Sequence, residues 1–205
     1  MPCRGRPELS AKAVECFLAQ TWRNKELVIL DDSEKPAFPN GPPAGDGIRY
    51  WSESGHATIG AKRNVCIGRA RGEMISHWDS DDHSDPGRMA DQVARLELWG
   101  AEATGYHSML FIDEKRKRAW RYHGRPDTAL GTSLCYLKSF WKRHPFQATT
   151  NVGEDAWLVR KTNGKIVAVD AGHMMFAREH GDNTAPRKMM DRRRWEPLAW
   201  PESAA

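Results

Sequence analysis

Short apolar runs alternate with amphipathic stretches along roughly the first hundred residues. The short runs predict buried strands, and the stretches in which apolar residues recur every three or four positions predict helices. Such alternation is typical of an α/β fold, in which helices flank a mostly parallel sheet. The predicted elements are a helix at 8–20, strands at 26–32 and 48–51, a helix at 58–70, a strand at 73–78, and a helix that begins near Ser84 or Asp85 and ends at Gly100.

The second half of the chain carries more closely spaced strand patterns. Apolar runs at 107–113 and 118–122 around the polar segment Glu114–Lys117 predict a hairpin. A strand at 132–137, a helix at 153–164 and strands at 165–170 and 173–180 follow. From Arg187 onward the chain is polar and has no clear period. We therefore expect a single domain over residues 1–186 and a polar tail over 187–205.

Composition places the chain among soluble globular proteins. Apolar residues make up 40% and charged residues 28%, and no run approaches the roughly 18 to 20 apolar residues that cross a bilayer. The first ten residues lack an apolar signal core, and the four cysteines form no CxxC pair. We therefore expect a cytoplasmic protein with reduced thiols, without a transmembrane segment, for which peripheral contact with the inner face of the membrane is an option.

The net charge of +4 comes largely from two basic runs, Glu114–Arg125 and Arg187–Trp195. Such runs suit nucleic acid, an anionic membrane surface or a phosphorylated substrate, and they also occur as solvated faces. Composition alone does not choose among these.

An acidic cluster follows the third predicted strand. Asp79, Asp81 and Asp82 come directly after the apolar run that ends at Trp78, and Asp85 lies close behind. Like charges this close raise one another's pKa unless water or a cation compensates them. A bound cation is therefore the more specific of the two interpretations.

Two acidic groups are expected at one edge of the sheet, because Asp31–Asp32 and Asp79–Asp82 both come just past the carboxyl ends of strands. Open α/β sheets bind ligands at that edge. Carboxylates there suit Mg²⁺ or Mn²⁺, which keep coordination places for water and substrate phosphates. Aspartate-rich loops also serve as plain turns and helix caps, so spacing alone leaves both interpretations open.

Several separated segments resemble family 2 glycosyltransferases of the GT-A fold. They are "RGRPELSAKAVECFLAQTW", "ELVILDDSE", "TIGAKRNVCIGRARGEMISHWDSDDHSDPGRMADQV" and "GTSLCYLKSFWKRHPF", followed by "NVGEDAWLVR". They occur in the family's order and cover roughly residues 1 to 185. The resemblance implies a Rossmann-like GT-A sheet with a nucleotide-sugar-binding half at about 1–100 and an acceptor half at about 101–186.

The same resemblance assigns residues to the donor. The family holds the ribose and a diphosphate-bound Mn²⁺ or Mg²⁺ with a DxD-type motif, which here is Asp79, Asp81 and Asp82, without a choice among the three for the metal. The other expected donor residues are Pro2, Cys3, Arg4 and Asp32 beside the nucleotide base, and Lys62 and Arg63 beside the diphosphate.

On the acceptor side, the family's "ED" motif matches Glu154 and Asp155, with Asp155 as general base and Glu154 as its neighbour. A carboxylate within about 3 Å of the acceptor hydroxyl can take its proton. Complementing a helix N-terminus is the alternative role for this pair. His180, in "FAREHGDNT", matches a segment that closes over the donor and is a candidate metal ligand.

The resemblance implies inverting transfer by single displacement to a glycan or lipid-linked acceptor, with nucleic acid not expected as a partner. One departure is that the family's first strand is nearly absent before Pro2, so we expect a truncated first strand. Three alternatives stay open from the residues alone: a nucleotidyltransferase, an inactive sugar- or nucleotide-binding protein, and a nucleic-acid binder acting through Glu114–Arg125.

Overall fold

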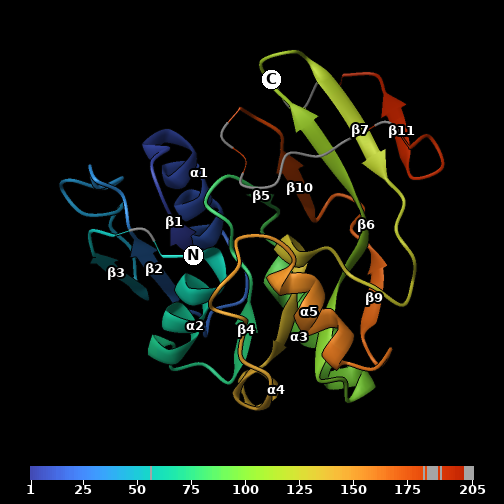
Figure 1. The fold of residues 1–205 in the computed structure, drawn as a ribbon, viewed down its shortest axis with the longest axis horizontal. Helices are drawn as coiled ribbons and strands as arrows, with labels where there is room; N and C mark the ends of the chain where they lie inside the picture. The colour runs from blue at the N-terminus through green and yellow to red at the C-terminus, as the bar shows by residue number, and fades with distance from the viewer. Residues whose placement is uncertain (56, 182, 184–188, 190, 201–205) are drawn as a thin grey trace.

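The computed structural model describes residues 1–55, 57–181, 183, 189 and 191–200, which form two β-sheets with helices packed on them (Figure 1). Residues 182 and 184 of the segment expected to close over the donor lie outside the described residues, as do 187, 188, 190 and 201–205 of the expected tail. No helix in the described ranges is long and apolar enough to cross a bilayer.

The first sheet is parallel throughout and has the order β1–β2–β3. Its central strand is buried along its whole length, and successive side chains point to opposite faces. Leu27 and Ile29 pack with α1, whereas Val28 and Leu30 pack with Cys66 of α2. Its elements are β1 (Pro2–Cys3), α1 (Pro7–Leu18), β2 (Leu27–Asp31), β3 (Ile48–Ser52) and α2 (Ile59–Arg69).

The two helices beside this sheet begin where local chemistry favours a start. Pro7 occupies the first turn of α1, where its missing N–H costs nothing. In α2, the Thr58 hydroxyl caps the helix by accepting a hydrogen bond of 3.2 Å from the Ala61 N–H. Phe17 of α1 is buried against Trp78 in an edge contact with ring centroids 6.1 Å apart, a burial that contributes about 2 kcal/mol.

The second sheet is mixed and is built around the 11-residue strand β6 (Figure 1). β6 pairs in parallel with β9 and β10 and antiparallel with β7 and β8, while β4 pairs with β8. Its helices α3, α4 and α5 cover β6 and β8. The elements are β4 (Met74–Ser76), β5 (His83–Ser84), α3 (Arg88–Trp99), β6 (Ala103–Asp113), β7 (Arg118–Tyr122), the 3₁₀ turn η1 (Gly131–Ser133), β8 (Cys135–Leu137), α4 (Lys138–Arg143), α5 (Glu154–Lys161), β9 (Val167–Asp170), β10 (Met175–Arg178) and β11 (Trp195–Leu198).

The α/β fold with a helix-flanked parallel sheet is confirmed, and β1 spans two residues. The structure differs from the sequence pattern in several elements, including β5 and α4, which no pattern predicted. The expected strand at 132–137 is the turn η1 followed by β8, and residues 195–198 of the expected tail form β11. β11 pairs antiparallel with β7 and buries Trp195 against Phe111. This contact is long-range, so the local hydrophobic pattern did not predict it.

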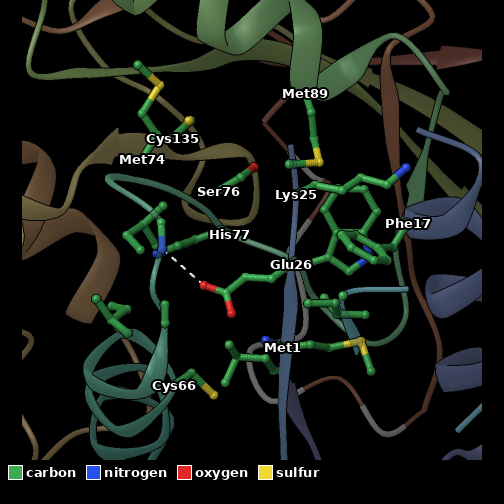
Figure 2. A pocket seen from close by; sticks show the side chains of 18 of the residues that line it. Met1, Phe17, Lys25, Glu26, Cys66, Met74, Ser76, His77, Met89 and Cys135 are labelled. Carbon is green, nitrogen blue, oxygen red and sulfur yellow. Dashed lines mark hydrogen bonds between the residues drawn. The ribbon is translucent and has the colours of Figure 1, made fainter. Parts of the chain in front are cut away.

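The two sheets are separated by a cavity of about 790 Å³, which we call the inter-sheet cavity (Figure 2). Within the described residues, β4 pairs with β8 alone, and β1 covers β2 only at Leu30 and Asp31. The Met1 amino group donates to the Val28 carbonyl at 2.6 Å, in the manner of a strand amide. At the other end, the Glu26 carboxylate accepts hydrogen bonds from the Arg71 and Gly72 N–H groups and so ties β2 to the loop before β4.

Candidate active site

The aspartates after β4 lie where the two sheets meet, and each has its own set of protein partners. Asp79 accepts a hydrogen bond of 3.1 Å from Arg63, which is buried in α2. Although burial opposes ionisation of Asp79, the Arg63 guanidinium lowers the pKa of this carboxyl to about 2. Asp79 is therefore ionised throughout the physiological pH range.

Arg63 also connects the acidic loop to α5. Its Nε lies 3.5 Å from Oε1 of Glu154, and both side chains are almost fully buried. Although burial disfavours the charged guanidinium, Asp79, Glu154 and Asp155 raise the pKa of Arg63 above its ordinary value. Burial raises the pKa of Glu154, and the Arg63 charge opposes that rise. One buried cation thus holds together acids that are 75 positions apart in the chain.

Asp82 turns away from its neighbours into the protein. The Thr132 hydroxyl donates to its Oδ2, and the Arg178 N–H donates to its Oδ1 at 3.2 Å. Burial, followed by the charges of Asp81 and Asp79, raises the pKa of Asp82 to about 8. Asp82 therefore supports the loop through its contacts with β10 and η1.

Asp81 and His180 do face one point. Oδ2 of Asp81 lies 3.0 Å from Nε2 of His180, and the Arg6 guanidinium contacts both. Among the described residues, no group of three or more His, Cys, Asp and Glu side chains could hold a metal ion. Two protein ligands fit a divalent cation whose remaining places go to phosphate oxygens and water, which is the usual arrangement for Mg²⁺. The donor set at Asp81 and His180 therefore suits a metal that binds together with a phosphate group.

Asp155 lies at the start of α5, where its Oδ1 accepts a hydrogen bond of 2.6 Å from the Ala156 N–H. Its Oδ2 lies against Gly131 of η1, so closely that a β-carbon on Gly131 would come within 1.6 Å of that oxygen. The next residue, Thr132, holds Asp82. The turn η1 therefore contacts the predicted general base on one side and the acidic loop on the other.

A second cavity, of about 630 Å³, opens beside β1 and is called the donor cavity below. Its lining includes four basic side chains, Arg4, Arg6, Lys35 and Lys62, and one acid, Glu34. A lining of this charge suits an anionic ligand. The remaining lining residues are Pro2, Cys3, Gly5, Ser33, Ala57, Ile59 and Asn151.

Asp32 lies next to the donor cavity and pairs with one of its lysines. Lys62 Nζ donates to Oδ1 of Asp32 at 2.7 Å, and both side chains are buried. Oδ2 of Asp32 is buried without a hydrogen-bond partner, which leaves one strong acceptor unsatisfied. Its neighbour Asp31 is fully occupied, because it accepts from Ala37 N–H at 2.7 Å and Tyr50 OH at 3.0 Å as well as from Ser33.

The structure brings the sequence-predicted residues together in three groups. Pro2, Arg4 and Lys62 line the donor cavity, and Asp32 pairs with Lys62 beside it. The second group is Arg63, Asp79, Glu154 and Asp155, and the third is Asp81 with His180, near Arg6.

Sequence reasoning missed Gly131, Thr132 and Arg178. Their segments carry ordinary strand patterns, and Thr132 and Arg178 meet Asp82 only across 50 and 96 positions of chain. The one local signal was a glycine preceding two hydroxyl residues, "GTS".

Comparison with known sequences gives a consistent picture. The profile described as glycosyl transferase family 2 matches residues 1–166. EpsE of Bacillus subtilis, assigned by name to the glycosyltransferases, is 32% identical over 109 residues, which are 51% of this chain and 39% of that protein. The succinoglycan biosynthesis protein ExoO of Rhizobium meliloti is 33% identical over 93 residues, 44% of this chain and 27% of that protein. The chain thus spans well under half the length of these relatives.

Solved structures share the fold. A TarS fragment from S. aureus in complex with UDP-GlcNAc matches with a TM-score of 0.70 and 15% identity, over 89% of this chain and 59% of that one. The mannosyltransferase PcManGT from Pyrobaculum calidifontis, in complex with GDP-Man and Mn²⁺, matches with a TM-score of 0.61 and 11% identity, over 91% of this chain and 56% of that one. Because the family profile covers most of the chain and the fold agrees, the chain belongs to glycosyl transferase family 2.

Proposed function

We propose that this protein transfers a sugar from a nucleotide-sugar donor to a hydroxyl acceptor, with inversion and with a divalent cation. The observation that carries the proposal is the buried Arg63, which contacts Asp79 at 3.1 Å and Glu154 at 3.5 Å. An arginine shared by Asp79 and Glu154 supports the proposal that the acids assigned to the donor and to the acceptor act in one site.

The donor cavity supports the binding half of the proposal. Its basic lining from Arg4, Arg6, Lys35 and Lys62 offers charge-assisted hydrogen bonds to a diphosphate. The unsatisfied Oδ2 of Asp32 offers an acceptor to an N–H of the nucleotide base. Pro2 lines the same cavity, so that β1 forms its wall. UDP-GlcNAc and GDP-Man are the donors named for two structural neighbours, and either base has an N–H for this acceptor.

Asp81 and His180 are the proposed protein ligands for Mn²⁺ or Mg²⁺, and Asp79 is assigned to the donor's ribose and diphosphate. Carboxylate and imidazole both suit Mn²⁺. When bound, the cation neutralises the charge that develops on the departing nucleoside diphosphate. Asp82, which is engaged by Thr132 and the Arg178 N–H, supports the loop that carries Asp81 and is the least suited of the three aspartates to ligate metal.

Asp155 is the proposed general base. It lies at the N-terminus of α5 and is partly buried, so that one oxygen bonds the helix N-terminus and the other faces Gly131 and the acceptor half. Its carboxylate takes the proton of the acceptor hydroxyl as that oxygen attacks the anomeric carbon, a contribution of about 10² to 10⁴ in rate. Glu154 holds Arg63, and the single displacement forms no covalent enzyme intermediate.

The acceptor is proposed to be a glycan or a lipid-linked glycan, and the site of action the cytoplasm or the inner face of the membrane. The relative named for succinoglycan biosynthesis supports a polysaccharide acceptor. Nucleic acid is not the proposed partner of the basic segment Glu114–Arg125, since its Arg116 and Arg125 pair with the flanking Asp113 and Asp127.

Thermal-shift screening of UDP-, GDP- and dTDP-sugars with and without Mn²⁺ tests this proposal, because a ligand that binds the folded state raises the melting temperature. We expect stabilisation by one nucleotide that requires Mn²⁺ and is lost in Asp81→Ala. Release of a nucleoside diphosphate in the presence of acceptor identifies a glycosyltransferase, whereas release of pyrophosphate identifies a nucleotidyltransferase. A folded protein that responds to none of these donors contradicts the proposal.

A further inference from the structure

Arg6 occupies the point at which Asp81 and His180 meet. Its Nη1 donates to Oδ2 of Asp81 and lies 3.3 Å from Nε2 of His180, and its Nη2 donates to the Ser80 hydroxyl at 3.3 Å. The side chain is 19% exposed, and its Nε is buried without a hydrogen-bond partner. The guanidinium is therefore the cation that compensates Asp81 in this structure.

The backbone at Arg6 is arranged to direct this side chain into the site. Arg6 has φ 61° and ψ 53°, a left-handed conformation that costs a non-glycine residue about 1 kcal/mol. Gly5 before it also has a positive φ, of 62°, and its N–H donates to the Ser33 hydroxyl at 2.6 Å. The turn lies immediately before α1, so the helix and the loop after β2 both fix the direction in which Arg6 leaves the backbone.

A metal ion and the guanidinium compete for the same ligand atoms. Mg²⁺ is held at about 2.0 to 2.1 Å from its oxygen ligands, and imidazole nitrogen binds transition metals at a similar distance. Oδ2 of Asp81 and Nε2 of His180 are 3.0 Å apart, and Nη1 of Arg6 already contacts both atoms. A cation bound to this pair therefore has to displace the guanidinium.

We propose that Arg6 is an internal cation that occupies the Asp81–His180 site of the metal-free protein and moves to the donor diphosphate when a divalent cation binds. Arg6 also lines the donor cavity. Once displaced from Asp81, its guanidinium can therefore pair with the donor's diphosphate in that cavity, but only when the donor is bound. Metal and donor then bind cooperatively, because the metal frees Arg6 to pair with the diphosphate, and the diphosphate compensates Arg6 for the loss of its ion pair with Asp81. This inference rests on the proposed function and adds to it a mechanism that disfavours metal binding without donor.

Titration of the 205-residue chain with Mn²⁺, followed by electron paramagnetic resonance of free Mn²⁺, tests the inference without any measurement of transfer. In the wild type we expect weak Mn²⁺ binding that tightens about tenfold or more when UDP or GDP is added. In Arg6→Gly, which removes the guanidinium and suits the left-handed backbone, we expect Mn²⁺ alone to bind about tenfold tighter, because a competing positive charge is gone. The nucleotide should then tighten Mn²⁺ binding much less.

Matched variants separate the guanidinium from other effects. Arg6→Asn also removes the charge, tolerates the left-handed conformation and provides a second variant should Arg6→Gly fold poorly. Arg6→Lys should retain most of the competition, and Arg23→Ala, which removes an exposed positive charge after α1, should bind Mn²⁺ as the wild type does. Asp81→Ala should abolish Mn²⁺ binding in every background.

The outcomes distinguish the inference from the proposal on which it rests. If the wild type binds Mn²⁺ through Asp81 but Arg6→Gly and Arg6→Asn bind it equally well or more weakly, Arg6 is not a competitor and the inference is wrong. If the wild type binds no Mn²⁺ even with UDP and GDP, and Asp81→Ala behaves identically, the metal site itself is wrong.

Discussion

The two cavities that border β1 differ in the residues that line them. The comparison shows that the volume of a cavity and the charge of its lining are independent properties. The inter-sheet cavity is larger, at about 790 Å³ against about 630 Å³, and most of its lining side chains are apolar, among them Val28, Ile67 and Ile75. Each cavity has four basic lining residues, but they are offset by three acidic residues in the inter-sheet cavity and by one, Glu34, in the smaller donor cavity. Excess positive charge, not size, therefore distinguishes the donor cavity as the one that suits an anionic ligand.

Their structural origins also differ. The inter-sheet cavity lies between two strand edges, those of β2 and β4, that share no hydrogen bonds in the described residues. The donor cavity lies beyond the carboxyl ends of β1 and β2, where the backbone leaves the sheet and side chains converge. Substitutions around the donor cavity should alter chemistry, whereas substitutions of apolar residues in the inter-sheet cavity should alter stability; Arg63, which also lines the inter-sheet cavity, is the exception.

The largest effect is expected for Asp155→Asn. An amide cannot accept the acceptor's proton, so kcat should fall about 10³-fold while donor binding, measured by thermal shift, stays unchanged. Asp127→Asn is the matched control, because it removes an exposed carboxylate of the same half that pairs with Arg125. Transfer within tenfold of the wild type in Asp155→Asn would show that another group is the base.

Gly131→Ala should have the next largest effect. The new β-carbon would lie 1.6 Å from the present position of Asp155 Oδ2, so the carboxylate must shift. A displacement of about 1 Å can cost about 10² in rate, and we expect this loss in kcat with the donor KM within about twofold. Gly68→Ala in α2, where nothing lies within 4 Å of the new β-carbon, is the control. Equal activity of the two variants would contradict a positioning role for Gly131.

The third prediction concerns pH. Burial and the neighbouring aspartates raise the pKa of Asp82 to about 8 from an ordinary value of 3.8. Between these values the folded state binds a proton that the unfolded state lacks, so the free energy of unfolding falls as pH rises. Asparagine does not titrate, so Asp82→Asn lacks this pH dependence. The melting temperature of the variant minus that of the wild type should therefore increase by about 5 °C between pH 5 and pH 8 in EDTA.

Differential scanning fluorimetry of both proteins across this pH range measures the difference directly. Subtracting the wild-type curve removes the contribution of other groups, including His77, whose pKa burial lowers. A difference that stays constant with pH would mean that Asp82 is already ionised at pH 5.

The smallest effect is expected in the inter-sheet cavity. Cys66→Met should fill part of it and raise the free energy of unfolding by about 1 kcal/mol, or about 3 °C in melting temperature, without changing transfer. Ala13→Val, at a fully buried position of α1 outside this cavity, should instead destabilise the protein by about 1 to 3 kcal/mol. Destabilisation of the same size in Cys66→Met, or a change in kcat, would contradict the separation of the two cavities.

Local patterns carried much of this structure. The periods around β2, α1 and α2 predicted their type and nearly their bounds, because each element buries one regular set of side chains and begins or ends at a recognisable residue such as Pro7 or Thr58. The order of motifs likewise indicated the family that the profile over residues 1–166 shows.

The partners of the acidic residues could not be read from the sequence. The family resemblance implied a metal at Asp79, Asp81 and Asp82 without a choice among them, whereas the loop directs them to Arg63, Arg6 and Thr132 respectively. These partners come from α2, from the turn before α1 and from η1.

The sequence by itself therefore determined the elements, their order and the residue types available for catalysis, since these depend on neighbours a few positions apart. The tertiary structure alone decided which cation pairs with which acid and where the inter-sheet cavity lies. It also brought Asp155 so close to residue 131 that a side chain there would displace the carboxylate. Asp81, for example, meets Arg6 and His180 from 75 and 99 positions away, and the geometry of such contacts depends on the packing of the whole domain rather than on any local period.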